Sequence, residues 1–249
     1  MTPARRAIER HQTAVLSDRY LEVMIHDLKG TGLLLIQAPL IAFGVAGVWS
    51  NISGDSEALY FVLSLSAFFL GAINASREIV KERALFLREK HFNLSVRAYL
   101  SSKLRVQAIL VLLQCALLAG IVRVFVPIKV NVLWLAIALI GVALAGTACG
   151  LLVSAWVTRS DRAVAMVPLL VIPQILFSDF VLGKEQLANW TGRVQDWMPV
   201  EWGYIVLTEL RDRNHTDWFR VLSAPVVLGA LIGVAFLLAW RRLAGARYG

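Results

Sequence analysis

Long stretches without charged residues constrain this chain more than any other feature. Six segments are almost free of Asp, Glu, Lys and Arg over the roughly 20 residues that a helix needs to cross a bilayer. These predicted spans are about 30–50, 58–76, 104–126, 131–157, 163–183 and 221–240. Of the 249 residues, 58% are hydrophobic and only 17% are charged, which excludes an ordinary soluble enzyme. We therefore expect an all-α integral membrane protein with six transmembrane helices.

The basic residues are distributed unevenly about these spans. With the N-terminus in the cytoplasm, 18 of the 25 Lys and Arg residues lie on the cytoplasmic side, namely those from Arg5 to Lys29, from Arg77 to Arg105, Arg159, Arg162, and from Arg241 to Arg247. Because cytoplasmic loops retain Lys and Arg, this asymmetry predicts a multi-pass protein of the cell membrane with both termini in the cytoplasm. The net charge of +8 then reflects topology, and nucleic acid is not expected as a partner.

Three segments outside the spans have helical patterns. Residues 1–29 have an apolar stripe among charges, which predicts an interfacial helix along the inner membrane surface. Residues 76–103 combine apolar positions with dense charge of both signs, which favours a cytoplasmic helical hairpin. The outer segment before the last span contains Trp190, Trp197, Trp202 and Trp218, and its apolar residues from Val200 to Leu210 have helical spacing. This pattern indicates a short amphipathic, re-entrant-like element; a solvated loop with anchoring aromatics is the alternative.

Motifs for catalysis are missing from the sequence. It contains no G-x-x-x-x-G-K-[ST] for nucleotide phosphates, no H-E-x-x-H and no G-x-S-x-G. None of the four histidines lies in a predicted span, and both cysteines lie in apolar runs. We therefore predict no catalytic site, no metal site and no cofactor in this chain. An intramembrane hydrolase or lipid transferase would need paired acids, or a serine or histidine base, at bilayer depth, and the spans offer none.

Several segments in order resemble a known family. They are DRYLEVMIHD at 18–27, LLLIQAPLIA at 33–42, NASREIVKERALFLREK at 74–90, MVPLLVIPQILFSDF at 166–180 and the outer W-x-x-x-x-x-x-W-x-P at 190–199. Together they resemble the membrane domain of ABC-2 type permeases, in particular G-type (white-family) exporters and bacterial relatives fused to an ATPase and a forkhead-associated domain. The resemblance covers nearly the whole chain, with 1–29 as the connecting helix and 30–249 as the transmembrane domain.

The resemblance implies how the chain would be driven. In such exporters the interfacial helix and the hairpin after the second span contact an ATPase, so the implied coupling residues are Glu78, Glu82, Arg83, Arg88 and Glu89. A mixed-charge surface also suits specific docking on physical grounds, with a solvated charged turn as the alternative. The ATPase would be a separate subunit that binds ATP and Mg, and a second permease copy, identical or related, would complete a dimer within the membrane lipids.

The resemblance also implies a path and a gate. The implied path residues, on the second and fifth spans, are Phe61, Phe68, Pro173, Gln174 and Phe177, and the implied outer gate is Phe180 and Val181. Asp179 stands where the family often has glycine, and we expect it to face the outer vestibule. Because the path is apolar, the expected cargo is lipid-like or amphipathic. The alternatives are a polysaccharide or glycolipid export permease and a non-transporting membrane scaffold.

Overall fold

The computed structural model describes residues 3–50, 55–182, 189–211 and 216–246. Within these ranges the regular elements are helices and no strand is present, which confirms the predicted all-α class. The helices are α1 (Pro3–His26), α2 (Leu28–Trp49), α3 (Glu57–Ala75), the 3₁₀ turn η1 (Val80–Glu82), α4 (Arg83–His91), α5 (Val96–Phe125), α6 (Val132–Trp156), α7 (Ser160–Ala165), α8 (Val167–Leu176), α9 (Asp179–Leu182), α10 (Asn189–Gln195), α11 (Pro199–Arg211) and α12 (Trp218–Gly245).

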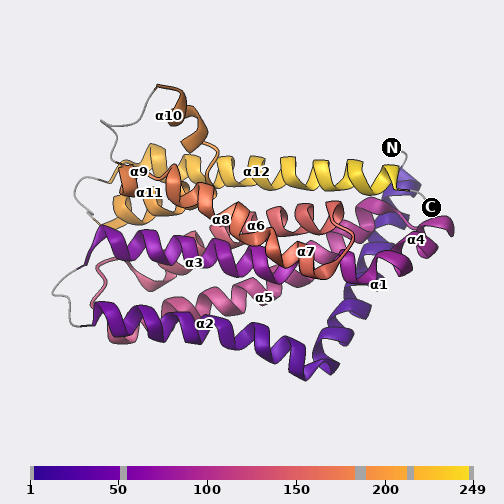
Figure 1. The fold of residues 1–249 in the computed structure, drawn as a ribbon, viewed down its shortest axis with the longest axis horizontal. Helices are drawn as coiled ribbons and strands as arrows, with labels where there is room; N and C mark the ends of the chain where they lie inside the picture. The colour runs from indigo at the N-terminus through magenta and orange to yellow at the C-terminus, as the bar shows by residue number, and fades with distance from the viewer. Residues whose placement is uncertain (1–2, 51–54, 183–188, 212–215, 247–249) are drawn as a thin grey trace.

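Five long helices form the body of the molecule. In Figure 1, α2, α3, α5, α6 and α12 extend along the long axis, and α1 crosses one end of this bundle. Both chain termini and α4 lie at that end, which we call the terminal end. The short helices α9, α10 and α11 lie at the opposite end, which we call the distal end. The chain thus separates its N-terminal helix and hairpin from its aromatic segment by the length of the bundle.

Polar side chains mark where the long helices start. Each of these five helices is preceded by a residue whose side chain accepts a backbone N–H of the first turn: Asp27, Ser56, Ser95, Asn131 and Asp217. Such caps satisfy donors that have no partner within the helix. The Ser95 cap starts α5 at Val96, so the second arm of the predicted hairpin 76–103 is the first part of α5.

All five long helices are apolar and long enough to cross a membrane. The predicted span 163–183 is different, because α7, α8 and α9 divide it into short pieces. Pro168 lies in the first turn of α8 and Pro173 lies inside it, and each removes a backbone donor that a continuous helix would use. Gly183 lies outside the described residues. Five apolar helices are therefore present in the described part of the chain, and the count of six spans remains a prediction.

Glycines let α3 and α6 approach each other closely. A Cβ atom added at Gly71 of α3 would lie 1.9 Å from the carbonyl oxygen of Ala143, and one at Gly146 of α6 would lie 2.2 Å from that of Phe68. At Gly150 it would lie 2.4 Å from the carbonyl oxygen of Ala72. Real side chains do not fit at these distances, so backbone packs directly on backbone. Small residues spaced by four are a common way for membrane helices to associate.

At the distal end, α11 packs on this same pair of helices. Val200 and Leu207 of α11 are buried, and a Cβ at Gly203 would lie 2.5 Å from a methyl group of Val142 and 2.9 Å from the hydroxyl of Ser64. The helical run predicted from Val200 to Leu210 is therefore a helix that lies against α3 and α6.

The α3–α6 contact predicts that a single added methyl group lowers the stability of the protein. We expect Gly146→Ala to destabilise the protein by about 1–3 kcal/mol, because the added carbon overlaps the α3 backbone. Gly44→Ala on α2 is the matched control, since its Cβ would meet nothing within 4 Å. Thermal unfolding of the detergent-solubilised protein measures both changes. Equal melting temperatures for the two variants would contradict the close contact.

Candidate functional site

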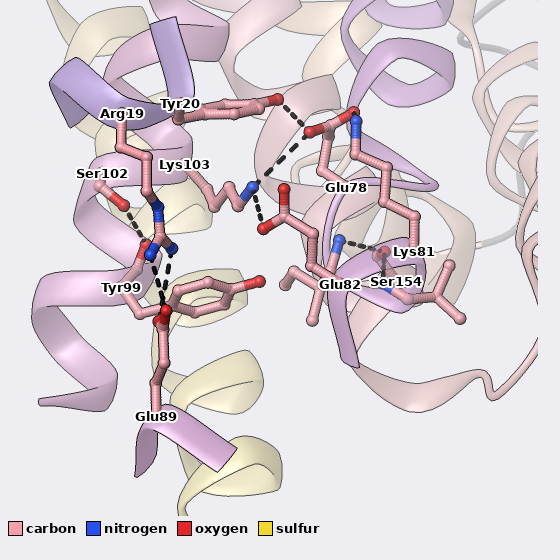
Figure 2. A network of polar contacts seen from close by, with 12 residues as sticks. Arg19, Tyr20, Glu78, Lys81, Glu82, Glu89, Tyr99, Ser102, Lys103 and Ser154 are labelled. Atoms are coloured by element: carbon pink, nitrogen blue, oxygen red, sulfur yellow. Dashed lines mark hydrogen bonds and ion pairs between the residues drawn. The ribbon is translucent and has the colours of Figure 1, made fainter. Parts of the chain in front are cut away.

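A buried lysine organises the terminal end of the bundle. The ammonium of Lys103, on α5, lies 2.6 Å from Oε2 of Glu82 and 3.9 Å from Oε2 of Glu78. It also lies 3.7 Å from the ring centroid of Tyr20, on α1. Only 2% of Lys103 is exposed. Figure 2 shows these side chains converging from α1, from the segment after α3, and from α5. A buried cation of this kind is stable only when it is paired.

Tyr20 extends the network towards α5. Its hydroxyl donates a hydrogen bond to Oε2 of Glu78 and accepts one of 2.9 Å from the side-chain amide of Gln107. Burial, reinforced by the nearby Glu78 carboxylate, raises the pKa of Tyr20 well above its usual value. The phenol is therefore a fixed proton donor. The other oxygen of Glu78 lies 2.6 Å from the ammonium of Lys81, so both oxygens of this buried carboxylate are satisfied.

The turn that follows α3 is held by α6. The hydroxyl of Ser154 accepts hydrogen bonds from the backbone N–H groups of Ile79 (2.9 Å) and Val80 (3.0 Å), as Figure 2 shows. One turn later, the guanidinium of Arg83 donates to the carbonyl oxygen of Val157, directly after α6 (2.9 Å). Ile79 and Val80 start the next helical segment, whose first N–H groups have no acceptor within the helix, and α6 supplies that acceptor.

Helix α4 is attached at its far end to α12 and α1. The ammonium of Lys90 donates to the carbonyl oxygens of Leu243, Ala244 and Ala246 at 2.7–2.9 Å, and so satisfies the C-terminal end of α12. Arg19 of α1 pairs with Glu89 at 2.6 Å.

The turn between α4 and α5 contacts α1 as well. Asn93 adopts a φ of 65°, which Asn tolerates better than most residues. Gln12 of α1 donates to its carbonyl oxygen and accepts the backbone N–H of Ser95. We call residues 76–92, which contain η1 and α4, the hairpin. It is therefore bound to α1, α5, α6 and α12, and its exposed side includes Arg77, Lys81, Arg88 and Phe92.

The predicted coupling residues lie in the hairpin but face different ways. Glu78 and Glu82 point into the network around Lys103. Arg83 and Glu89 contact α6 and α1. Arg88 lies on the exposed side of the hairpin.

Sequence reasoning missed Tyr20, Lys103, Gln107 and Ser154 as site residues. A signal was present for two of them, because Tyr99, Lys103 and Gln107 follow one another at four-residue steps on the buried face of α5. A polar row within a buried stripe indicates a partner on a neighbouring helix. No comparable signal marks Tyr20 or Ser154.

The predicted path residues lie on the neighbouring helices α3 and α8. Phe68 is buried in the packed interior, and Phe61 lies near the distal end of α3. Pro173 and Gln174 are on α8, and Phe177 follows its last residue. The side chain of Gln174 accepts the backbone N–H of Val200 at 3.1 Å, which links α8 to the start of α11.

The predicted gate residues begin α9 at the distal end. Phe180 stacks on Phe61 with ring centroids 5.0 Å apart, and both rings contact Tyr204 of α11 edge-on. Phe180 is 40% exposed and Val181 is 47% exposed. The predicted gate residues therefore form a half-exposed apolar surface next to an aromatic base, the rings of Phe61 and Tyr204.

A buried carboxylate holds the bend between α8 and α9. Oε2 of Glu201, on α11, accepts the hydroxyl of Ser178 at 3.1 Å and the backbone N–H of Asp179 at 3.3 Å. The hydroxyl of Ser178 in turn accepts the N–H of Phe180 at 3.2 Å. Burial, together with the charge of Asp179, raises the pKa of Glu201 to about 7. The carboxyl is thus half-ionised near neutral pH.

Comparison with known proteins decides the family. The family model described as "ABC-2 type transporter" matches residues 11–210. The chain belongs to the ABC-2 type transporter family. This match extends from α1 to α11, so it includes the network, the hairpin and the predicted gate residues of the permease.

One curated relative of this ABC-2 permease is the ABC transporter ATP-binding/permease protein Rv1747 of Mycobacterium tuberculosis. The two are 25% identical over 227 residues, which cover 81% of this chain and 25% of the relative. The permease thus spans about a quarter of the length of the curated relative that it matches. The family match and the five apolar helices identify a multi-pass membrane component of an ABC transporter.

The network predicts that Lys103 is essential to the fold of the permease. We expect Lys103→Met to destabilise it by about 3–5 kcal/mol, because buried Glu78 would keep only Lys81 and half-buried Glu82 would lose its cation. Arg105→Met is the control, since Arg105 is exposed on the same helix. Chemical unfolding followed by tryptophan fluorescence compares the two. A loss below about 1 kcal/mol in Lys103→Met, the range of exposed pairs, would show that the pairing is weak.

Proposed function

We propose that this permease is the membrane subunit of an exporter for a lipid-like or amphipathic cargo. A separate ATPase subunit would hold ATP and Mg and drive the cycle. The observation that carries the proposal is the hairpin, whose inner side is bonded to four helices while its outer side, with Arg88, is exposed. A push on such an element moves the helices to which it is fixed.

The proposed coupling path has two parts. Arg88 and the other exposed hairpin residues receive the ATPase, where charge of both signs gives specificity. Glu78 and Glu82 pass the displacement to α5 through Lys103, and Ser154 passes it to α6. These buried residues act as positioning residues, while Arg88 makes the direct contact.

The proposed transport path lies between two copies of the chain. Leu169, Ile172 and Leu176 of α8 are exposed apolar residues in one copy, and a second copy would pack against them in place of lipid. Phe61, Phe68, Pro173, Gln174 and Phe177 would then border the path. Lipid-like cargo suits a path with few polar groups, whereas a polysaccharide would need many hydrogen-bonding partners.

The proposed orientation places the hairpin and both termini in the cytoplasm, as the excess of basic residues at the terminal end supports. It is tested in intact cells with an impermeant thiol reagent, after Cys115 and Cys149 are replaced by alanine. We expect labelling of Lys129→Cys, in the exposed α5–α6 connection, and none of Ala84→Cys in the hairpin. The reverse labelling pattern would show that the protein has the opposite orientation in the membrane.

The ATPase itself is identified by co-purification, and cargo is identified by its stimulation of ATP turnover. Arg88→Glu should lower this stimulation at least tenfold, because one reversed contact opposes docking by more than about 1.4 kcal/mol. The exposed side chain makes no contact that folding needs, so the variant should keep the wild-type melting temperature. Lys129→Glu is the control at the distal end. Full stimulation in Arg88→Glu would place the docking surface elsewhere, and no ATPase partner at all would favour a scaffold.

The gate generates a separate prediction. Replacing both Phe180 and Val181 by alanine should increase leak of a small fluorescent probe from proteoliposomes several-fold, because an apolar seal excludes water through its side chains. Phe219→Ala, an exposed aromatic at the start of α12, is the control. An unchanged leak at equal protein content would show that the seal lies in another part of the path.

A further inference from the structure

The distal end contains an acidic cavity for which the proposed coupling and gating provide no ligand. It has a volume of about 390 Å³, and its lining includes Asp179, Gln195, Asp196, Glu201, Trp202 and Arg220. We call it the acidic pocket. Three carboxyl groups thus face one cavity, contributed by α9, α11 and the residue that follows α10.

Glu201 shows that this cavity suits a positive ligand. The residue is 2% exposed, and its Oε2 is occupied by the bend before α9. Its other oxygen, Oε1, is buried and accepts no hydrogen bond of normal geometry, although the amide of Gln195 lies nearby. A buried carboxylate oxygen without a donor is costly. A bound N–H donor with positive charge would satisfy it and offset the repulsion from Asp179.

The chemistry of the lining favours an ammonium group over a metal ion. Among the described residues, no group of three or more His, Cys, Asp and Glu side chains is placed to hold a metal. Trp202 supplies an aromatic wall, which attracts alkylammonium groups. Arg220 lines the same cavity, and its own ion pairs are long, 3.5 Å to Glu209 and 3.6 Å to Asp217, with half of its side chain exposed. The pocket therefore presents acids and one cation to the same ligand.

An apolar groove begins on the same tryptophan. Trp202 also lines a cavity of about 320 Å³ between α6, α11 and α12, together with Trp134, Gly141, Pro225, Leu228 and Gly229. A Cβ added at Gly229 would meet nothing within 4 Å. Glycine there leaves open space rather than a tight helix contact. The groove has an apolar lining and enough volume for part of a hydrocarbon chain.

We propose that the acidic pocket and this groove together bind one amine-bearing phospholipid, of the phosphatidylethanolamine class. Its ammonium donates to Oε1 of Glu201 beside Asp179 and Trp202, its phosphate pairs with Arg220, and an acyl chain occupies the groove. The charge pattern selects this headgroup, since phosphatidylcholine has no N–H to donate and phosphatidylglycerol has no cation.

Native mass spectrometry of the purified permease with equimolar phosphatidylethanolamine and phosphatidylcholine tests the site. We expect wild type to retain the ethanolamine lipid in roughly fivefold preference, as one charge-assisted hydrogen bond allows. Glu201→Gln should abolish the preference, while its amide oxygen still accepts Ser178 and the N–H of Asp179. Glu57→Gln, an exposed acid at the same end, should keep it. Gly229→Leu should reduce retention of both lipids.

The preference should also depend on pH. Because the pKa of Glu201 is raised to about 7, the acceptor is mostly neutral at pH 5.5 and mostly ionised at pH 8.5. The preference should therefore fall at the lower pH. Asp179, Asp196, Arg220 and Tyr204 are the other titratable groups around this carboxyl, and Glu201→Gln should remove the pH dependence if Glu201 causes it.

Three results would overturn the proposal. Equal retention of the two lipids by wild type would show that the pocket does not recognise the headgroup. Stronger retention of phosphatidylglycerol would show that the pocket selects a negatively charged headgroup. If free ethanolamine protects the protein against unfolding and the protein shows no preference among lipids, the ligand is a soluble amine. Lipid retention needs neither ATPase nor transport, so failure here is distinct from failure of the proposed export function.

Discussion

The direct backbone contact between α3 and α6 sets the geometry of both ends of this permease. Glycines at the contact fix how far one helix is shifted along the other. With that register, Ser154 of α6 lies beside the start of η1 and accepts the N–H groups of Ile79 and Val80. At the distal end, Val142 and Ser64 form the surface on which Gly203 of α11 packs. A shift of one residue would misplace all of these partners, since helix side chains rotate by about 100° per residue.

The two ends differ in how their charges are stabilised. At the terminal end, the buried carboxylates have a buried cation and a phenol as partners, so the pairing holds the hairpin in one place. At the distal end, Glu201 lies next to another acid and retains an unsatisfied oxygen. The first arrangement suits transmission of force, because a fully paired network resists rearrangement. The second suits recognition, because its best partner comes from outside the chain.

Much of this fold was predictable from the sequence because lipid demands long apolar helices. The apolar runs predicted α2, α3, α5, α6 and α12, and the stripe in residues 1–29 predicted α1. The interruption of 163–183 was not predicted, because two prolines in an apolar run permit either a bent helix or separate pieces. Which of these forms depends on tertiary acceptors, here Gln174 and Glu201, that connect α8 and α9 to α11.

The site was predictable only in part. The density of charge in 76–103 marked the hairpin, but a count of charges along the chain does not separate a buried Glu78 from an exposed Arg88. That distinction depends on Lys103, which is 25 residues away in sequence and lies opposite Glu78 only after α5 has packed. Asp179 was expected at a vestibule, and it does line a cavity, although the decisive carboxylate there is Glu201 of a different helix.

Helix α3 extends from the hairpin at the terminal end to the aromatic residues at the distal end. The hairpin begins directly after its last residue, Ala75, and the aromatic base of the gate, Phe61, lies one turn from its first. At 1.5 Å per residue the helix is about 28 Å long, so a tilt of about 5° about one end moves the other by roughly 2.5 Å. That displacement is about half the separation of the stacked Phe61 and Phe180 rings. Because α6 packs on α3 by backbone contact, a tilt of α3 would carry α6 with it and change the separation of the Phe61 and Phe180 rings.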